Sequence, residues 1–178
     1  MSKMSSSWMD HVPATVTTIL FISQIIIGSY LLSEVTQIEF LAYTGVLLYF
    51  FSGVVFGMLP VFEFRKKGGI LKGRSYIHTT KLVNTGIYSI VRHPQYITFI
   101  LFAFSGMLLF QHWIAIMLGI PVIPLTYFDL INADKDAIKK FGDNYKTYMK
   151  KVPRANFLLG LLKIIQMKKM KSQNKCSS

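Results

Sequence analysis

A block of ionisable and aromatic residues lies directly before an apolar run. The block, Lys81 to Tyr96, reads KLVNTGIYSIVRHPQY, and the apolar run Ile97 to Phe110 follows it. Ionisable side chains are costly to hold at membrane depth, so a compact set of them beside an apolar segment indicates a functional site. The alternative interpretation is that Arg92 and His93 only anchor a helix end at the lipid headgroups. Both interpretations place the block where water meets hydrocarbon.

Four apolar runs predict membrane-spanning helices. Of the 178 residues, 52% are hydrophobic and 16% are charged, and a helix needs about 20 apolar residues to cross the hydrocarbon of a bilayer. Because Pro94 lacks an N–H and disfavours helix at the residue before it, we expect the third helix to begin at or just after Pro94. We predict an all-α integral membrane protein, a single domain over residues 1–178 with about four transmembrane helices. The runs are approximately Ala14 to Leu32, Phe40 to Phe62, Ile97 to Phe110 and Trp113 to Ile131.

The distribution of charge predicts the orientation in the membrane. Basic residues are concentrated between Arg65 and Arg92 and again after Lys135, whereas the segment Ser33 to Glu39 contains two acidic residues and no basic one. By the positive-inside rule, both termini and the basic loop face the cytoplasm. A net charge of +12 is also typical of nucleic-acid-binding proteins, but here it follows the membrane topology. We therefore expect contact with anionic lipid headgroups and no nucleic acid.

The segment after the fourth run is predicted to be helical and interfacial. Between Asp134 and Lys151, large side chains recur at helical spacings of three and four, which favours an amphipathic helix on the membrane surface. They are Ile138, Phe141, Tyr145 and Tyr148. From Asn156 to Met170 the sequence mixes large apolar residues with lysines. That pattern is typical of a helix lying in the interface rather than of a fifth span, so residues 155–178 are predicted to form a basic interfacial tail.

The candidate site residues lie near the predicted cytoplasmic ends of the spans. The third and fourth runs form a short hairpin, so their cytoplasmic ends must be close together. The sequence has no Cys/His ligand cluster and no HExxH, GxSxG or GxGxxG motif, so we expect neither a catalytic metal nor a soluble dinucleotide fold. A cationic and aromatic pocket with carboxylates opposite suits a zwitterionic cofactor that carries an aromatic base. The residues expected to converge are His78, Tyr88, Arg92, His93, Tyr96, Asp129, Asp134 and Asp136.

Two segments carry a resemblance to a known family. The block KLVNTGIYSIVRHPQY, an apolar hairpin, and then FGDNYKTYMKKVPR (Phe141 to Arg154) resemble the isoprenylcysteine carboxyl methyltransferase family and its relatives, the phospholipid N-methyltransferases. The resemblance covers roughly Leu71 to Arg154. It implies an integral membrane enzyme that uses S-adenosylmethionine as methyl donor, with a cytosolic cofactor pocket and a lipidic acceptor that arrives from the bilayer.

The resemblance also implies which residues hold the cofactor. The family usually has a Glu-Glu pair ahead of its FG, and those positions are Ala133 and Asp134 here. Asp134 can still accept a hydrogen bond from an ammonium group, whereas Ala133 can contribute only backbone or packing, and Asp136 is the alternative acceptor. The remaining implied cofactor contacts are Leu82, Val83, Tyr88, His93, Pro94, Gln95 and Tyr96.

Three residues are implied to act on the methyl acceptor or beside it: His93, Arg92 and Asp129. Prenylcysteine enzymes place an arginine near this turn to meet the substrate carboxylate, but the matching position here is Asp129. An aspartate suits an amine acceptor better, and a structural pairing with Arg92 is equally open. His93 is the candidate base for an ammonium acceptor, or otherwise donates a hydrogen bond to the cofactor. Overall similarity ranks a lipidic carboxylate acceptor first and a phospholipid amine second.

Two other classes of protein share parts of this pattern. Membrane sterol reductases that use NADPH resemble this architecture, but they usually read RHPNY followed by small and acidic residues, whereas this chain reads RHPQYITF. A non-catalytic membrane scaffold is favoured only by the missing Glu-Glu pair. Both classes therefore rank below the methyltransferase.

Overall fold

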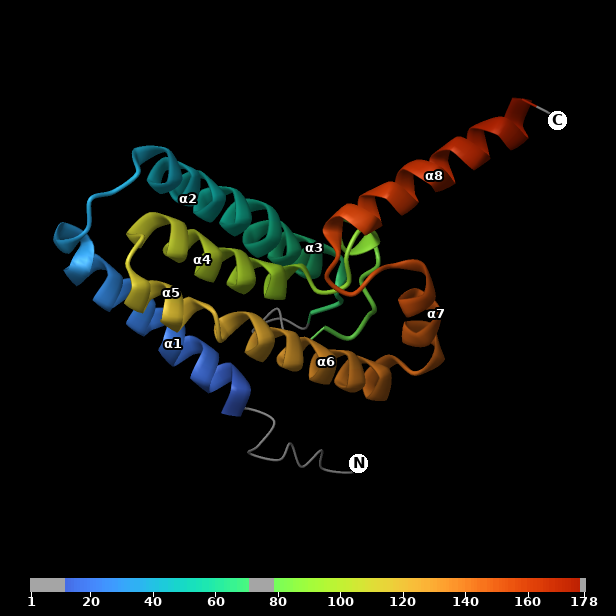
Figure 1. The fold of residues 1–178 in the computed structure, drawn as a ribbon. Coiled ribbons are helices and arrows are strands. Elements are labelled where there is room, and N and C mark those ends of the chain that lie inside the picture. Colours follow the sequence, from blue (N-terminus) through green and yellow to red (C-terminus); the bar gives the residue numbers. More distant parts are fainter. Residues whose placement is uncertain (1–11, 71–78, 177–178) are drawn as a thin grey trace. The chain divides into compact units, whose positions relative to one another are not determined.

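The computed structural model describes residues 12–70 and 79–176 (Figure 1). These residues fall into two compact units. Unit 1 contains the described residues of Met1–Gly57 and Gln95–Asp136, and unit 2 contains those of Met58–Pro94 and Ala137–Ser178. Within these described ranges all regular structure is helical and no strand occurs. The prediction of an all-α membrane protein is confirmed.

Unit 1 is a bundle of apolar helices. Helix α1 packs along α5, and α5 is separated from α6 by a bend at Ile120 and Pro121 (Figure 1). Proline lacks the N–H that a continuous helix would need there, so the bend falls at Pro121. The elements are α1 (Val12–Tyr30), η2 (Leu31–Glu34), α2 (Glu39–Ser52) with its π-helical continuation η3 (Gly53–Met58), α4 (Pro94–Phe110), α5 (Trp113–Gly119) and α6 (Val122–Phe141).

Among the described residues, three helical stretches are long and apolar enough to cross a bilayer: Pro13–Glu34, Glu39–Lys67 and Trp113–Phe141. Helix α4 begins at Pro94, as predicted, and is also apolar, but it has only 17 residues. At about 1.5 Å per residue it extends roughly 25 Å, somewhat less than the roughly 30 Å of bilayer hydrocarbon. The membrane character of the chain is therefore clear, while a fourth full span stays a prediction.

Gln24 joins three helices of unit 1. Its side chain is fully buried, and its Nε2 donates to the carbonyl oxygens of Ala103 on α4 and Ala115 on α5, both at 3.0 Å. A Cβ at Gly106 or Gly119 would come within 3.0 Å of the Gln24 amide. Glycine at both positions therefore leaves the space in which this amide links the helices, as polar side chains do between membrane helices.

Gln111 fastens the turn between α4 and α5 to the segment before α2. Its backbone has φ 49°, and its side chain exchanges two hydrogen bonds with the Ile38 backbone. Gln111 Oε1 accepts from the Ile38 N–H at 2.9 Å, and Nε2 donates to the Ile38 carbonyl at 3.0 Å. The short turn predicted at Gln111 and His112 is present, since α4 ends at Phe110 and α5 begins at Trp113.

Unit 2 contains α3 (Leu59–Lys67), the 3-10 turn η4 (Gly86–Ser89), α7 (Asp143–Lys151) and α8 (Phe157–Cys176). The prediction of one continuous amphipathic helix from Asp134 to Lys151 is wrong, because Gly142 interrupts it with φ 58° and ψ −134°. Side chains make this backbone conformation costly, so a glycine there ends α6 and lets α7 begin in a new direction.

The beginnings of α7 and α8 are stabilised locally. In the first turn of α7, Lys146 donates a hydrogen bond to Asp143 at 2.9 Å, which holds the pKa of this exposed carboxyl below its ordinary value. Asn156 Oδ1 accepts from the Leu159 N–H at 2.9 Å, as a helix N-cap does. The predicted helix after Asn156 is thus confirmed, and its interfacial location stays a prediction.

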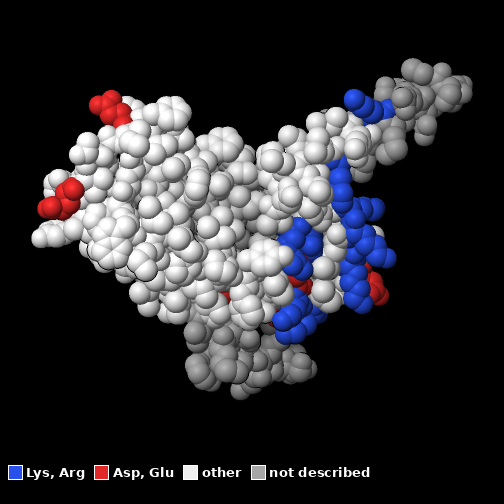
Figure 2. Space-filling view, in the orientation of Figure 1, with Lys and Arg blue, Asp and Glu red and all other residues white. Residues whose placement is uncertain are grey.

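Charged side chains are distributed differently in the two units (Figure 2). In unit 2, lysines and arginines occupy the last turns of α3 and α7, and basic side chains gather over α7 in the space-filling view. In unit 1, Glu34 in η2 and Glu39 in the first turn of α2 are exposed and acidic.

Candidate functional site

A cavity of about 110 Å³ in unit 2 is lined by five of the residues predicted to form the site. They are Leu82, Val83, Tyr88, Arg92 and His93. All five belong to the first motif segment, in which η4 and the extended stretches beside it hold the chain against α7. The structure therefore gathers this part of the motif around one space.

The second motif segment forms the other wall of the same cavity. Phe141, Tyr145 and Tyr148 line it, and the backbones of the two segments are hydrogen-bonded to each other. The Arg92 N–H donates to the Pro153 carbonyl at 3.0 Å, and the His93 N–H donates to the Arg154 carbonyl at 3.2 Å. These bonds fix the RHP sequence against the VPR sequence, although about sixty residues separate them in the chain.

His93 and Arg92 both contact Tyr145. The Tyr145 hydroxyl lies 3.1 Å from His93 Nε2, at hydrogen-bonding distance. The Arg92 guanidinium lies 5.9 Å from the centroid of the Tyr145 ring, which is a cation–π distance. Since Arg92 and Tyr145 are 8% and 3% exposed, this contact is shielded from solvent and holds the arginine head beside the cavity.

Tyr88 is held rigidly by two neighbours. Its ring stacks on Phe64 of α3 with centroids 4.6 Å apart and an interplanar angle of 19°. Its backbone carbonyl accepts a hydrogen bond from the Tyr148 hydroxyl at 2.5 Å. The side chain is 4% exposed, so Tyr88 serves as packing for the cavity wall as well as lining it.

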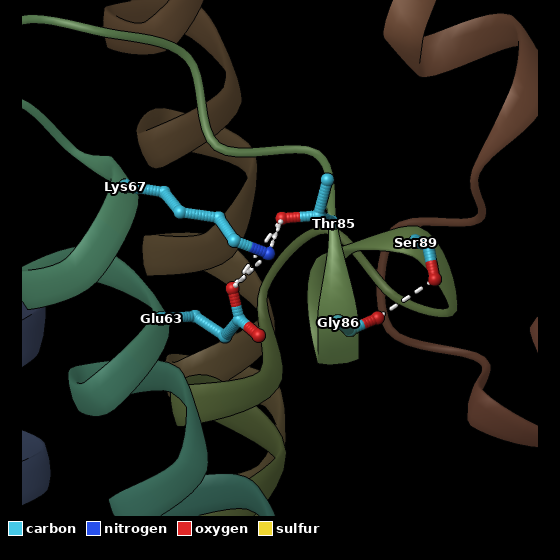
Figure 3. Close-up of polar contacts among 5 residues, drawn as sticks. All are labelled: Glu63, Lys67, Thr85, Gly86 and Ser89. Carbon is cyan, nitrogen blue, oxygen red and sulfur yellow. Dashed lines mark hydrogen bonds and ion pairs between the residues drawn. The ribbon is translucent and has the colours of Figure 1, made fainter.

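A polar cluster attaches η4 to α3 (Figure 3). Lys67 Nζ lies 3.1 Å from Glu63 Oε2 and donates to Thr85 Oγ1 at 2.8 Å, and the Thr85 hydroxyl donates to Glu63 Oε2 at 3.3 Å. The next residue, Gly86, has φ 59°, and a Cβ there would overlap the Glu63 carboxylate. A glycine is therefore required where the loop passes close to α3 and turns toward Tyr88.

The lining of this cavity fits part of S-adenosylmethionine. Its aromatic rings suit an adenine, and the cations of Lys81 and Arg92 suit a carboxylate. Pockets for whole ligands usually measure about 300–1,000 Å³, so a cavity of about 110 Å³ takes only a portion of a cofactor of this size. The residues present fit the group, and the rest of the cofactor requires further contacts.

The other predicted site residues lie in unit 1. Asp129 and Asp136 are both within electrostatic range of the Tyr96 hydroxyl, so the expected convergence of α4 and α6 is present for these three. Asp129 and Asp134 are 9% and 2% exposed, whereas Asp136 is exposed.

The remaining predicted residues flank these groups. Gln95 follows Pro94 in the first turn of α4, and Ala133 is half-buried on α6 one turn after Asp129. Pro94 itself is fully buried in unit 2. His78 lies outside the described residues.

The sequence interpretation missed the direct partners of the RHP segment. The sequence predicts Tyr145 and Tyr148 as part of a helical pattern and of a motif, but not as contacts of this segment. Phe64 and Lys81 are not among the predicted site residues. One signal was available for the tyrosines, since they are the two aromatic positions of FG-x-x-Y-x-x-Y. Nothing in the sequence indicated Phe64, which reaches the cavity only because α3 packs beside η4.

Comparisons with known proteins match the segment that forms this site. Residues 70–152 match the model of the isoprenylcysteine carboxyl methyltransferase (ICMT) family. Over 98 residues the chain is 30% identical to a "Protein-S-isoprenylcysteine O-methyltransferase" of Schizosaccharomyces pombe. The matched segment covers 50% of this chain and 42% of that relative. The chain thus spans less than half the length of the curated relative. No solved structure matches it.

Proposed function

We propose that this chain is a membrane methyltransferase of the isoprenylcysteine carboxyl methyltransferase family, whose model residues 70–152 match. It would use S-adenosylmethionine and methylate a lipidic acceptor. One observation carries the proposal: the two motif segments meet around one aromatic and cationic cavity, and the backbone bonds of Arg92 and His93 join them. A scaffold that had lost its activity would not need this arrangement of polar and aromatic groups.

The residues of unit 2 would hold one part of the cofactor. Tyr88 and Tyr145 offer ring faces to the adenine, Lys81 and Arg92 meet the carboxylate, and His93 is oriented by the Tyr145 hydroxyl. The family resemblance assigns the ammonium group to Asp134, which stands at the position of a family glutamate and is buried. When bound, the cofactor supplies an electrophilic methyl group on a sulfonium.

The protein's contribution to the reaction is alignment and desolvation. Holding two reactants in line and away from water is worth up to about 7–11 kcal/mol of the barrier in favourable systems. A carboxylate acceptor is already ionised and needs no base. An ammonium acceptor must first lose a proton, and His93 would then take it. Deprotonation is therefore the step at which the two candidate acceptors differ.

We rank the acceptors as a prenylated or other lipidic carboxylate first and a phospholipid amine second. The name of the fission-yeast relative supports the first. The buried Asp129 supports the second, because a carboxylate in place of the family's arginine attracts an ammonium group and repels a carboxylate. Purified chain with a labelled methyl donor should methylate an S-prenylated cysteine with a free carboxyl group in preference to phosphatidylethanolamine. Transfer to the phospholipid alone would reverse the ranking.

The proposed orientation has both termini and the basic loop on the cytoplasmic side, where S-adenosylmethionine is present. The tail helix α8 would lie at the interface and contact anionic headgroups through its lysines. A cysteine introduced at Gln37 or Gln111 should react with an impermeant reagent applied from outside, and one at Ser75 should not. Labelling of Ser75→Cys from outside would contradict this topology.

The Tyr145 hydroxyl provides a specific test of the cofactor site. Tyr145→Phe removes only the group that contacts His93 Nε2, and a hydrogen bond of this kind contributes about 0.5–1.5 kcal/mol. We expect S-adenosylhomocysteine to bind roughly 2–10-fold more weakly, by about 1.4 kcal/mol per tenfold. Isothermal titration of the purified chain measures this change.

The matched control is Tyr43→Phe, because Tyr43 is 67% exposed on α2 and lies outside the cavity. It should leave affinity unchanged. Binding of NADPH in place of S-adenosylhomocysteine would instead support a reductase, and binding of neither would support a scaffold.

A further inference from the structure

Unit 1 contains a second and larger cavity, of about 430 Å³. It lies among α1, α2 and α4, and its volume falls within the roughly 300–1,000 Å³ range of ligand pockets. Most of the surface that it presents is apolar, from side chains such as Ile25, Leu32, Val46 and Leu109. A space of this size and chemistry, framed by helices of a membrane protein, suits a hydrocarbon chain.

An aromatic stack bounds the cavity at one end. Phe102 lies between Phe21 and Tyr49, with ring centroids 5.9 Å and 4.2 Å away and interplanar angles of 17° for both pairs. Along α4, the lining extends from Phe102 to Phe110. Tyr96 precedes Phe102 by about 9 Å along the helix axis, since each helical residue rises about 1.5 Å. The cavity is therefore separate from the polar end of α4 and belongs to the opposite half of the helix.

The buried amide nearest to this cavity is turned away from it. Gln24 is among its lining residues but is 0% exposed, because its amide is turned toward the carbonyls of Ala103 and Ala115. Close approach of the helices fixes the shape, since a Cβ at Gly45 would lie 2.9 Å from the Ser105 carbonyl oxygen. The walls thus present mainly hydrocarbon in a defined form, as expected of a site for an apolar chain.

The connection between η2 and α2, next to this cavity, is acidic. Leu32, a lining residue, lies in η2 two residues before Glu34, and α2 begins with Glu39. Both glutamates are exposed, and among the described residues no ion pair is formed by either. No lysine or arginine occurs between Ser33 and Glu39. A headgroup located here meets a negative field, which favours a cationic amine and disfavours an anionic headgroup.

We propose that unit 1 binds a membrane lipid whose single hydrocarbon chain fills this cavity and whose headgroup carries a protonated amine. The proposal is independent of methyl transfer, because the cavity uses none of the motif residues of unit 2. The bound lipid bridges α1, α2 and α4 where Gln24 and Gly45 already bring these helices together.

A photoreactive lysophosphatidylethanolamine, with a diazirine in its acyl chain, tests the proposal on the full chain reconstituted in vesicles. After irradiation, mass spectrometry should locate the label on peptides that contain Leu32 or Phe102. A tenfold excess of unlabelled lysophosphatidylethanolamine should reduce this labelling, since a defined site saturates. Labelling that excess lipid does not reduce would identify general contact with bilayer lipid and would overturn the proposal.

Two adjacent isoleucines provide a matched pair of variants. Ile25 lines the cavity, whereas Ile26 is 63% exposed and does not. Ile25→Trp should reduce labelling by about fivefold or more, which corresponds to about 1 kcal/mol, the lower end of the cost of overpacking. Ile26→Trp should leave it unchanged. Equal labelling in both variants would overturn the proposal, and the competition experiment on the unaltered chain decides it if Ile25→Trp does not fold.

The headgroup is tested by a lysophosphatidylglycerol probe with the same photoreactive chain. It should label the cavity less than the amine probe does. The double variant Glu34→Gln, Glu39→Gln should reduce the difference by about twofold or more, since exposed charge pairs contribute up to about 1 kcal/mol. Equal labelling by both probes in the unaltered chain would overturn the assignment of an amine headgroup.

Discussion

The two cavities differ in how the sequence makes them. In unit 2, segments about sixty residues apart meet through directed contacts, such as the hydrogen bonds from the Arg92 and His93 N–H groups to Pro153 and Arg154. In unit 1, the larger cavity is left between helices whose apolar side chains do not fill the space. The first depends on particular residue types, and the second on the sum of side-chain volumes. A motif therefore indicates the first kind of site and is silent about the second.

The two cavities also differ in the chemistry of their linings. The unit 2 cavity brings cations, rings and an imidazole together, so it can recognise charge and an aromatic base. The unit 1 cavity turns its buried amide away and presents hydrocarbon. If this contrast is correct, substitutions in unit 2 should alter cofactor binding and leave lipid labelling of unit 1 intact.

The largest effect is expected where α8 begins. A Cβ at Gly160 would overlap the Ile90 carbonyl oxygen, which is backbone and cannot rotate away. Alanine favours a helix over glycine by about 1 kcal/mol, but overpacking costs about 1–3 kcal/mol and occasionally more. Gly160→Ala should therefore lower the free energy of unfolding. It should also weaken S-adenosylhomocysteine binding, because Ile90 lies two residues before Arg92, which lines the cavity.

Gly57→Ala is the control for this substitution. The nearest side-chain atom to a Cβ at Gly57 is 3.7 Å away, an ordinary contact. Thermal unfolding in one detergent should show a lower midpoint for Gly160→Ala only. A higher midpoint for Gly160→Ala would mean that α8 is not seated against Ile90.

The second effect concerns the carboxylate that takes the place of the family's glutamates. Asp134 is 2% exposed, and a charged partner left without its buried acceptor costs about 1–3 kcal/mol or more. Asp134→Asn should therefore reduce affinity for S-adenosylhomocysteine about tenfold or more. Asp136→Asn, the matched control at an exposed position of the same helix, should reduce it far less.

The alternative is that Asp136→Asn has the larger effect on affinity, because Asp136, like Asp129, is within electrostatic range of the Tyr96 hydroxyl. A larger loss in Asp136→Asn would shift the cofactor contact by two residues along α6. Unchanged affinity in both variants, with methyl transfer retained, would remove this turn from the cofactor site.

Some features were predictable from the sequence because they rest on local chemistry. Pro94 fixes the start of α4, since the residue has no N–H to donate. The apolar runs predicted the membrane class, because their length matches the thickness of a bilayer. The break at Gly142 was predictable in principle but was missed, since helical spacing of Ile138, Phe141, Tyr145 and Tyr148 continues through it. The apolar spacing predicts a continuous helix, whereas the backbone conformation of Gly142 ends it.

Other features depend on contacts between distant residues. The pairing of His93 with Tyr145 and the stacking of Phe64 on Tyr88 require the fold to bring separate elements together. The unit 1 cavity depends on where side chains fail to meet, and hydrophobicity alone does not distinguish a filled space from an empty one. The positions of Asp129 and Asp134 were predicted, but their burial, which decides how strongly each would act, was not.

The smallest effect is expected at the polar cluster of Glu63, Lys67 and Thr85. The Lys67 side chain is 42% exposed, so water and salt screen its ion pair, and exposed pairs of this kind contribute about 0–1 kcal/mol. Lys67→Ala should lower the unfolding midpoint slightly at low salt. The difference should shrink at 1 M salt, where the Debye length falls from about 10 Å to about 3 Å.

The Lys146 and Asp143 pair of α7 sharpens this last comparison. Each pair lies on one helix and the separations are similar, 2.9 Å against 3.1 Å, but the Lys146 and Asp143 side chains are more exposed, at 59% and 92%. Lys67 also donates a hydrogen bond to Thr85, in the loop that carries Tyr88. Lys67→Ala should therefore weaken S-adenosylhomocysteine binding by up to about twofold, a loss within the range of a partly screened contact. Lys146→Ala should alter neither the affinity nor its salt dependence. If both variants behave alike in titrations at two salt concentrations, the cluster does not position the cavity wall. The contacts of Tyr88 with Phe64 and with the Tyr148 hydroxyl would then hold η4 in place.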